Sequence, residues 1–179
     1  MTRATVWFTG LPGAGKTTVA TTLQRRLDEL NMRTFLLDGD LLRAGLNSDL
    51  TYSDEDRAEN VRRVGEVALL FATVGHLSLV TVISPYDAGR TFVRARHEAQ
   101  GVPFLEVYVS TPLEVCERRD PKGLYARARR GEVKRFTGVS APYEVPEDAE
   151  LEILTTDQTP DESAGEVFDF LVAQGLAPG

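Results

Sequence analysis

The amino-acid sequence predicts an α/β protein built around a mostly parallel, doubly wound β-sheet. Short apolar runs typical of strands alternate along the chain with longer segments of helical periodicity, which is the pattern of successive β–α units. The first of these runs also leads through a glycine-rich turn directly into a helical segment. The predicted strands cover residues 5–9, 34–37, 77–83, 104–109 and 151–154, and the clearest predicted helices cover residues 17–30, 54–74, 87–99, 112–119 and 161–173.

Length and composition indicate one compact domain. A chain of 179 residues with 42% apolar and 26% charged residues can bury one core but is short for two ordinary domains. The first predicted strand begins too early to leave room for a signal peptide, and no apolar run approaches the ~20 residues of a membrane span. The single cysteine, Cys116, cannot form an internal disulfide. We therefore expect a single domain over residues 1–179, a cytoplasmic location and no membrane partner.

The turn after the first predicted strand carries a phosphate-binding motif. Residues 10–17 read Gly-Leu-Pro-Gly-Ala-Gly-Lys-Thr, which fits G-x-x-x-x-G-K-[ST] between a strand and a helix. The glycines let backbone N–H groups point into one concavity, and the helix N-terminus adds its positive dipole end. Lys16 would reach the terminal phosphates and the Thr17 hydroxyl would ligate Mg²⁺. A glycine-rich turn without a ligand is the alternative, but the complete motif in this context favours a nucleoside triphosphate.

The second predicted strand ends in a pair of carboxylates. Its apolar residues lead into Asp38, Gly39 and Asp40, and Arg43 follows one turn later. In such sheets ligands gather at the carboxyl ends of the strands, where two aspartates can hold Mg²⁺ through its waters or take a proton from an attacking hydroxyl. An Asx turn that closes the strand is the other interpretation of this triplet.

The third predicted strand ends in a different way. It exits into residues 83–86, Ile-Ser-Pro-Tyr, without the aspartate of a Walker-B motif. The absence of that acidic residue assigns the metal and base work to Asp38 and Asp40.

The longest predicted helix has clear boundaries and two polar residues near its start. Ser53 precedes it as an N-cap with Asp56 three residues later, Gly75 follows its end, and apolar residues recur every three or four positions from 61 to 71. Arg57 and Asn60 share one face of its first turns. That pair suits an anion with a neighbouring ribose or base, although a solvated helix face is the more common explanation.

One segment of the chain is strongly basic. Residues 118–135 hold eight basic and two acidic residues, or +6, which leaves −13 for the rest of a chain whose net charge is −7. An acidic protein with one basic segment is not built to coat nucleic acid, so no nucleic-acid partner is expected. The segment could be a solvated helix face. Beside a phosphate loop we favour a mobile lid whose arginines close over a polyphosphate.

Several short motifs together resemble the adenylylsulfate (APS) kinase family. They appear in the family's order and spacing behind the phosphate loop, and the resemblance runs from the first predicted strand to the last. The motifs are Asp38-Gly39-Asp40 with Arg43, residues 56–63 (Asp-Arg-Ala-Glu-Asn-Val-Arg-Arg), residues 83–86, residues 119–125 (Arg-Asp-Pro-Lys-Gly-Leu-Tyr), Phe136-Thr137-Gly138 and Pro142-Tyr143-Glu144.

The resemblance implies a five-stranded P-loop kinase fold with a basic lid and an ATP- and Mg²⁺-dependent activity. The implied reaction phosphorylates the ribose 3′-hydroxyl of adenosine 5′-phosphosulfate (APS) to give 3′-phosphoadenosine 5′-phosphosulfate. A homodimer is expected from the resemblance alone. Direct in-line transfer is expected, with Ser84 as a hydrogen-bonding wall residue, because no neighbouring base is apparent to make Ser84 a phosphorylated intermediate.

The resemblance also implies roles for individual residues. Asp40 would lie nearest the 3′-hydroxyl, Asp38 would support it or the metal with Thr17, and Tyr52 and Phe136 would sandwich the substrate adenine. Residues expected to bind ATP are Gly10, Gly13, Ala14, Gly15, Lys16, Thr17, Thr18, Arg118, Arg119 and Arg129. Residues expected to bind APS are Asp40, Arg43, Tyr52, Arg57, Asn60, Ile83, Ser84, Lys122, Gly123, Leu124 and Phe136.

Two positions depart from the usual family pattern. Leu41 stands where asparagine is usual, and Thr51-Tyr52 stands where Gly-Phe is usual. These changes leave the phosphoryl-transfer residues in place but bear on the base and sugar pocket. Two alternatives therefore stay open: a sibling kinase for another modified nucleotide, such as cytidine diphosphoramidate, and a non-catalytic regulatory module. The intact phosphate loop argues against the second.

Overall fold

The computed structural model describes residues 2–179 and contains one five-stranded sheet. Its strands are β1 (Ala4–Thr9), β2 (Thr34–Asp38), β3 (Leu77–Thr81), β4 (Phe104–Val109) and β5 (Leu151–Ile153). They lie in the order β2-β3-β1-β4-β5, and every neighbouring pair is parallel. The predicted doubly wound sheet is therefore confirmed, and the described strands are parallel throughout.

The apolar character of each strand follows from its place in the sheet. β1 and β3 are buried along their whole length because helices cover both faces, so apolar residues occupy most of their positions on both faces. β2 lies at the edge, where Phe35 is exposed and only Leu37 is fully buried. The third strand ends at Thr81 rather than at the predicted Ile83, and Ser84 beyond it has a φ of +41°.

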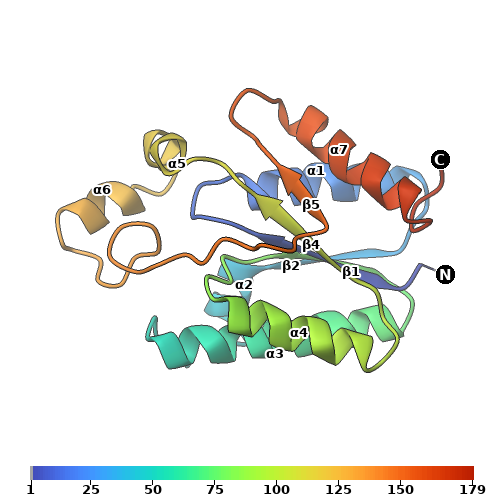
Figure 1. The fold of residues 1–179 in the computed structure, drawn as a ribbon, viewed down its shortest axis with the longest axis horizontal. Helices are drawn as coiled ribbons and strands as arrows, with labels where there is room; N and C mark the ends of the chain where they lie inside the picture. The colour runs from blue at the N-terminus through green and yellow to red at the C-terminus, as the bar shows by residue number, and fades with distance from the viewer. Residues whose placement is uncertain (1) are drawn as a thin grey trace.

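Two pairs of helices enclose the sheet (Figure 1). α1 (Lys16–Glu29) and α7 (Pro160–Ala173) pack together on one face, and α3 (Asp54–Thr73) and α4 (Asp87–Glu98) pack together on the other. Gly65 permits the close approach of α3 to α4, because a Cβ at that position would lie 2.6 Å from Val93 Cγ2. No helix within residues 2–179 combines the length and apolarity needed to cross a membrane.

The longest helix begins and ends close to the predicted residues. The Ser53 hydroxyl accepts a hydrogen bond from the Asp56 N–H at 3.2 Å, which caps α3, and Gly75 follows the helix with a φ of +90°. Val64 and Ala68 of the predicted apolar stripe are fully buried. The start of α3, with Arg57 and Asn60, is thereby held at the same end of the sheet as the phosphate loop.

Two short helices were not predicted from the sequence. α2 (Gly39–Ala44) starts where β2 ends, and α6 (Leu124–Arg129) follows α5 (Leu113–Arg119) within the basic segment. Each has six residues, too few for a periodic apolar pattern. Local capping stabilises both, since Asp38 accepts from two N–H groups of α2 and the Asp120 carboxylate accepts from the N–H groups of Tyr125 and Ala126.

Because all five strands run the same way, their carboxyl ends meet at one edge of the sheet. The phosphate loop, the Asp38 turn and Ser84 follow β1, β2 and β3, and Thr111 and Thr155 follow β4 and β5. α5 and α6 extend beyond this edge (Figure 1). The topology thus collects the chemically loaded strand exits in one place.

Candidate active site

The phosphate loop has a backbone that only glycine can follow at its key positions. Gly10 and Gly15 have φ values of +150° and +104°, and a Cβ at Gly10 would lie 2.7 Å from the carbonyl oxygen of Val109. The Ala14 carbonyl accepts hydrogen bonds from the hydroxyls of Thr111 and Thr155, each at 2.9 Å. The exits of β4 and β5 therefore hold the loop in shape from behind.

Lys16 lies at the centre of this loop. Its side chain is 9% exposed, and its ammonium donates to the carbonyls of Gly10 at 2.8 Å and Leu11 at 2.7 Å. Burial lowers the pKa of Lys16 from 10.5 to about 8. The loop thus presents a cation that is only partly compensated by neutral carbonyls, which is a suitable partner for a phosphate.

Asp38 joins the loop to the second strand. Its Oδ2 accepts from the hydroxyls of Thr17 at 2.8 Å and Thr81 at 3.1 Å, and its Oδ1 accepts from the N–H groups of Asp40 and Leu41. Burial alone would raise the pKa of Asp38, but these hydrogen bonds outweigh it and leave the pKa below its ordinary value. Both the Asx-type turn and the carboxylate pair of the sequence analysis are present, since Asp38 caps α2 and stays ionised next to exposed Thr17. Thr18 beside it is also exposed.

Asp40 and Arg43 lie one turn apart on α2. The Asp40 carboxylate is exposed and forms an ion pair with Lys122 of the basic segment. The Arg43 guanidinium donates to the Thr51 carbonyl at 2.7 Å and lies 4.6 Å from the centre of the Tyr52 ring. Unlike Asp38, Asp40 accepts no hydrogen bond from the backbone of residues 2–179, and its contact is the ion pair with Lys122.

Arg57 bridges the two segments that carry the predicted aromatic pair. Its Nε donates to the Tyr52 carbonyl at 3.0 Å, and its terminal nitrogens donate to the Thr137 hydroxyl at 2.6 Å and to the Arg135 carbonyl. Tyr52 is 60% exposed, whereas Phe136 is 8% exposed and packs edge-on against Tyr125. The structure brings their chain segments together, but in residues 2–179 the two rings are not among the aromatic pairs in contact.

Asn60 and Ser84 are buried beside these residues. The side-chain oxygen of Asn60, Oδ1, accepts a hydrogen bond from the side-chain amide of Asn47 at 3.0 Å. The Ser84 hydroxyl donates to Thr9 Oγ1 at 2.8 Å and accepts from the Trp7 indole at 3.1 Å. Its contacts are therefore with neutral groups and include no carboxylate or imidazole. Ile83 lies next to it, and its carbonyl accepts from the Thr9 hydroxyl at 2.8 Å.

The basic segment is held by contacts of several kinds. Arg119 donates to Thr155 Oγ1 at 2.9 Å and to the Thr155 carbonyl at 2.7 Å, behind the phosphate loop. Arg129 pairs with Glu117, and Arg118 is exposed. Gly123, with a φ of +64°, is the N-cap residue before α6, and Leu124 packs against the main core. Ion pairs also engage Lys122, Arg127, Arg130 and Arg135.

Sequence reasoning missed some residues that shape this site. Thr155 supports both Ala14 and Arg119, Thr81 supports Asp38, and the Tyr143 hydroxyl is 2.9 Å from Thr9 Oγ1. The rule that strand exits carry function would have found Thr155, since it directly follows the last strand. Thr81 lies inside a strand and has no local sequence signal. Tyr143 belongs to the motif at residues 142–144, but its role at the site was not predicted because it reaches the site from a long loop.

Comparison with known proteins identifies the family of this chain. The sequence model of the family described as "Adenylylsulphate kinase" matches residues 2–154. This chain belongs to the adenylylsulphate kinase family. The adenylyl-sulfate kinase of Clostridium acetobutylicum is 49% identical over 168 residues, covering 94% of this chain and 82% of that protein. The bifunctional enzyme CysN/CysC of Mycobacterium tuberculosis is 53% identical over 167 residues, which cover 93% of this chain but 27% of that protein.

Solved structures of the family superpose well on this chain. The Mycobacterium tuberculosis APS kinase CysC, in complex with AMPPNP and APS, has a TM-score of 0.93 and 50% identity over 96% of this chain and 99% of that one. A hexameric APS kinase from Thiobacillus denitrificans has a TM-score of 0.75 and 34% identity over 99% of this chain and 30% of that one. The resemblance read from the motifs and the expected P-loop kinase fold are both confirmed.

Proposed function

We propose that this protein is an adenylyl-sulfate kinase, which transfers the γ-phosphoryl group of ATP to the ribose 3′-hydroxyl of adenosine 5′-phosphosulfate. The product is 3′-phosphoadenosine 5′-phosphosulfate. The observation that carries the proposal is the meeting, at one edge of the sheet, of an intact phosphate loop with the carboxylates and arginines of the family pattern. Relatives that are about half identical across nearly the whole chain are named adenylyl-sulfate kinase.

The donor side consists of the phosphate loop and the start of α1. Backbone N–H groups between Gly10 and Thr18 would cradle the ATP phosphates, and Lys16 would exchange its loop carbonyls for phosphate oxygens. Arg119, already fixed behind the loop by Thr155, would add charge with Arg118 and Arg129 as the basic segment closes. Phosphoryl transfer needs mainly positioning and charge neutralisation, and these groups supply both.

The residues beside the loop fit the Mg²⁺ ion that such a reaction uses. Residues 2–179 contain no group of three or more His, Cys, Asp or Glu side chains placed to hold a metal. Thr17 and Asp38 instead offer a hydroxyl and an ionised carboxylate 2.8 Å apart, and Mg²⁺ is commonly held by one or two such oxygens together with substrate phosphates and water. When bound, the ion would neutralise charge on the transferring phosphate.

The acceptor side is built from α2, the start of α3 and the loop after β3. Asp40 would accept the proton of the attacking 3′-hydroxyl, Arg43 and Arg57 would hold the phosphosulfate, and Asn60 would bind the sugar. Ser84 would line the wall, because its hydroxyl is engaged by neutral partners and lacks a base. Ile83, Lys122, Gly123 and Leu124 would complete the pocket through side-chain and main-chain contacts.

The adenine would lie between two aromatic residues with different surroundings. We place the exposed ring of Tyr52 on the outer side and Phe136, supported by Tyr125, on the inner side. The Arg43 guanidinium already lies over one face of the Tyr52 ring, so the adenine would add a second flat group to this arrangement.

A coupled kinase assay tests the function directly. Purified protein with Mg²⁺ and ATP should phosphorylate APS and should leave cytidine nucleotides unmodified. Turnover of cytidine diphosphoramidate without turnover of APS would reassign the acceptor while keeping the donor side. No turnover of either, with APS bound tightly, would support a regulatory module instead.

We further propose that residues 1–179 fold as one domain that assembles as a homodimer. The support for assembly is the family itself, in which an oligomeric relative has been solved as a hexamer. Sedimentation equilibrium of the purified chain should give twice the mass of 19.7 kDa. A single-chain or a six-chain mass would contradict the dimer.

A further inference from the structure

Arg135 ends the basic segment in a conformation that residues other than glycine rarely adopt. Its φ is +56°, in the left-handed region, where a side chain persists mainly when its surroundings impose it. The Arg135 carbonyl accepts a hydrogen bond from the buried guanidinium of Arg57. The backbone just before Phe136 is therefore held directly by helix α3.

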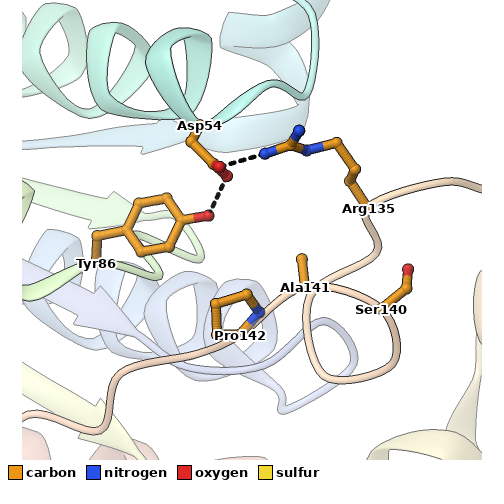
Figure 2. A pocket seen from close by; sticks show the side chains of 6 residues that line it. All are labelled: Asp54, Tyr86, Arg135, Ser140, Ala141 and Pro142. Atoms are coloured by element: carbon orange, nitrogen blue, oxygen red, sulfur yellow. Dashed lines mark hydrogen bonds and ion pairs between the residues drawn. The ribbon is translucent and has the colours of Figure 1, made fainter.

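The side chain of Arg135 returns to the same helix. Its guanidinium pairs with one carboxylate oxygen of Asp54, the first residue of α3, and the other oxygen accepts from the Tyr86 hydroxyl at 2.5 Å. Figure 2 shows Asp54 between the two partners. Hydrogen bonds from Arg135 and Tyr86 lower the pKa of Asp54, which keeps it ionised. Three segments far apart in the sequence meet at this carboxylate.

The three residues border a cleft on the acceptor side. With Ser140, Ala141 and Pro142 they line a space of about 500 Å³ (Figure 2). Each also lies within three residues of a proposed acceptor residue: Asp54 precedes Arg57 by one turn, Tyr86 follows Ser84, and Arg135 adjoins Phe136.

Folding stability gives little reason for this cluster. The Asp54 and Arg135 side chains are 54% and 50% exposed, and an ion pair at that exposure contributes little to the free energy of unfolding. The unusual backbone of Arg135 also works against it. The cluster thus contributes little to the free energy of unfolding, yet it joins three segments that carry proposed acceptor-binding residues. Its contacts are well placed to fix the positions of those segments relative to one another.

We propose that Asp54, Tyr86 and Arg135 form a clasp that positions the acceptor-nucleotide pocket. They are positioning residues, because they act through Arg57, Ser84 and Phe136 rather than on the reacting atoms. The inference rests on the proposed function and adds residues to it. The clasp keeps the segment after α6 against the start of α3, so its loss should weaken use of the acceptor nucleotide and spare ATP.

Steady-state kinetics of clasp variants tests this inference. Asp54→Asn and Arg135→Gln should each raise KM for APS by roughly two- to fivefold, the scale of one partly exposed ion pair, and should leave KM for ATP and saturating kcat unchanged. The double variant should be no worse than either single variant, because one pair is lost in all three. Tyr86→Phe should raise KM for APS by a smaller factor. Arg135→Lys keeps the charge, so its KM for APS should stay close to that of the native protein.

Arg25→Gln is the matched control. Arg25 forms an exposed ion pair with Asp161, remote from the site residues, so its KM for APS should equal that of the native protein. Thermal unfolding of every variant checks that folding is intact. Clasp variants with unchanged KM for APS, with additive effects, or with equal rises in KM for ATP would overturn the inference. Absence of APS phosphorylation by the native protein would instead contradict the proposed function.

Discussion

At the scale of single residues, the site depends on charges that the fold leaves unequally compensated. Asp38 has four hydrogen-bond donors, while Asp40 is exposed and has an ion pair with Lys122 as its contact. Lys16 is buried against two carbonyls without a carboxylate in hydrogen-bond contact. These differences support the distinct roles that we propose for the three residues, and each proposed role can be tested by one substitution.

Removal of the Lys16 ammonium should abolish catalysis without unfolding the protein. We expect Lys16→Ala to lower kcat by ~10²-fold or more, the cost of losing one preorganised charge-stabilising contact. The free energy of unfolding should not fall appreciably, because the ammonium is buried without a carboxylate partner and its burial disfavours the charged form. The assay with ATP and APS and a thermal melt measure the two effects. Retained turnover would remove Lys16 from the donor site.

The lowered pKa of Lys16 gives a signed pH dependence. Since burial brings the pKa to about 8, the ammonium loses its proton above that pH, and KM for ATP should rise between pH 8 and 10. Stability should move the opposite way: from pH 8 to 10.5 the unfolded chain binds the proton more tightly, so this group favours folding increasingly as the pH rises. Denaturant unfolding of native protein and Lys16→Ala across this range isolates the contribution, which should be missing from the variant.

The two aspartates should respond differently to the same isosteric change. Asp40→Asn removes the proposed base and should lower kcat by about 10²–10⁴-fold. Asp38→Asn keeps an N-cap for α2 but loses the charge beside Thr17, so its defect should be relieved in part by high Mg²⁺. Rates across a Mg²⁺ titration separate them. If Asp38→Asn has a low kcat that high Mg²⁺ does not restore, and Asp40→Asn has the kcat of the native protein, the two roles are reversed.

At the scale of elements, the helices place these residues by packing closely on the sheet. α3 carries Arg57 and Asn60 at its start and meets α4 along its length, with Gly65 at the point of nearest approach to Val93. α1 carries Lys16 and Thr17 and packs on α7 across the other face. The position of the site therefore depends on helix packing far from the chemistry.

Two helical glycines should respond oppositely to alanine. Gly65→Ala should lower the free energy of unfolding by about 1–3 kcal/mol, because the new methyl group would clash with Val93. Gly165→Ala in α7 is the matched control, since the nearest atom to its Cβ is Arg26 Nη1 at 3.8 Å, and it should be neutral or stabilise by about 0.5–1 kcal/mol. Chemical denaturation measures both. Val93→Ala should relieve the Gly65→Ala clash, and failure to do so would contradict the packing argument.

At the scale of the whole molecule, the proposed acceptor pocket combines segments that lie far apart in the sequence. Tyr52 precedes α3 and Phe136 follows the basic segment, and Arg57 hydrogen bonds to both of these chain segments. Lys122 and Asp40 join the basic segment to α2. The pocket therefore exists only when the basic segment and the sheet edge are assembled.

Stacking on Tyr52 should be measurable by titration. Tyr52→Ala should weaken APS binding by roughly ten- to a hundredfold in the presence of ADP, because base stacking on an aromatic ring contributes ~1–3 kcal/mol. Tyr52→Phe keeps the ring and should bind as the native protein does. Phe136→Ala should weaken APS binding by a similar factor and also lower stability, because Phe136 belongs to the main core. Calorimetry showing equal APS affinity for Tyr52→Ala and Tyr52→Phe would exclude the stack.

Much of the fold could be predicted because its signals are local. Burial on both faces makes β1 and β3 mainly apolar, and Ser53 and Gly75 mark the ends of α3. The glycines of the phosphate loop lie where the backbone adopts positive φ values between residues 10 and 15. The short motifs likewise indicated the family, whose sequence model matches residues 2–154. Helices α2 and α6 escaped prediction because six residues carry no usable periodicity.

The sequence by itself determined the α/β class, the phosphate loop and the family, since each depends on residue types at short, fixed spacing. Only the tertiary structure decided the strand order, the partners of the basic residues and the burial of Phe136 against Tyr125. The sequence of a basic segment does not specify whether its arginines are solvated or paired with carboxylates. Asp54 and Arg135 become partners only because parallel strands bring all their exits to one edge and the long loop returns across it.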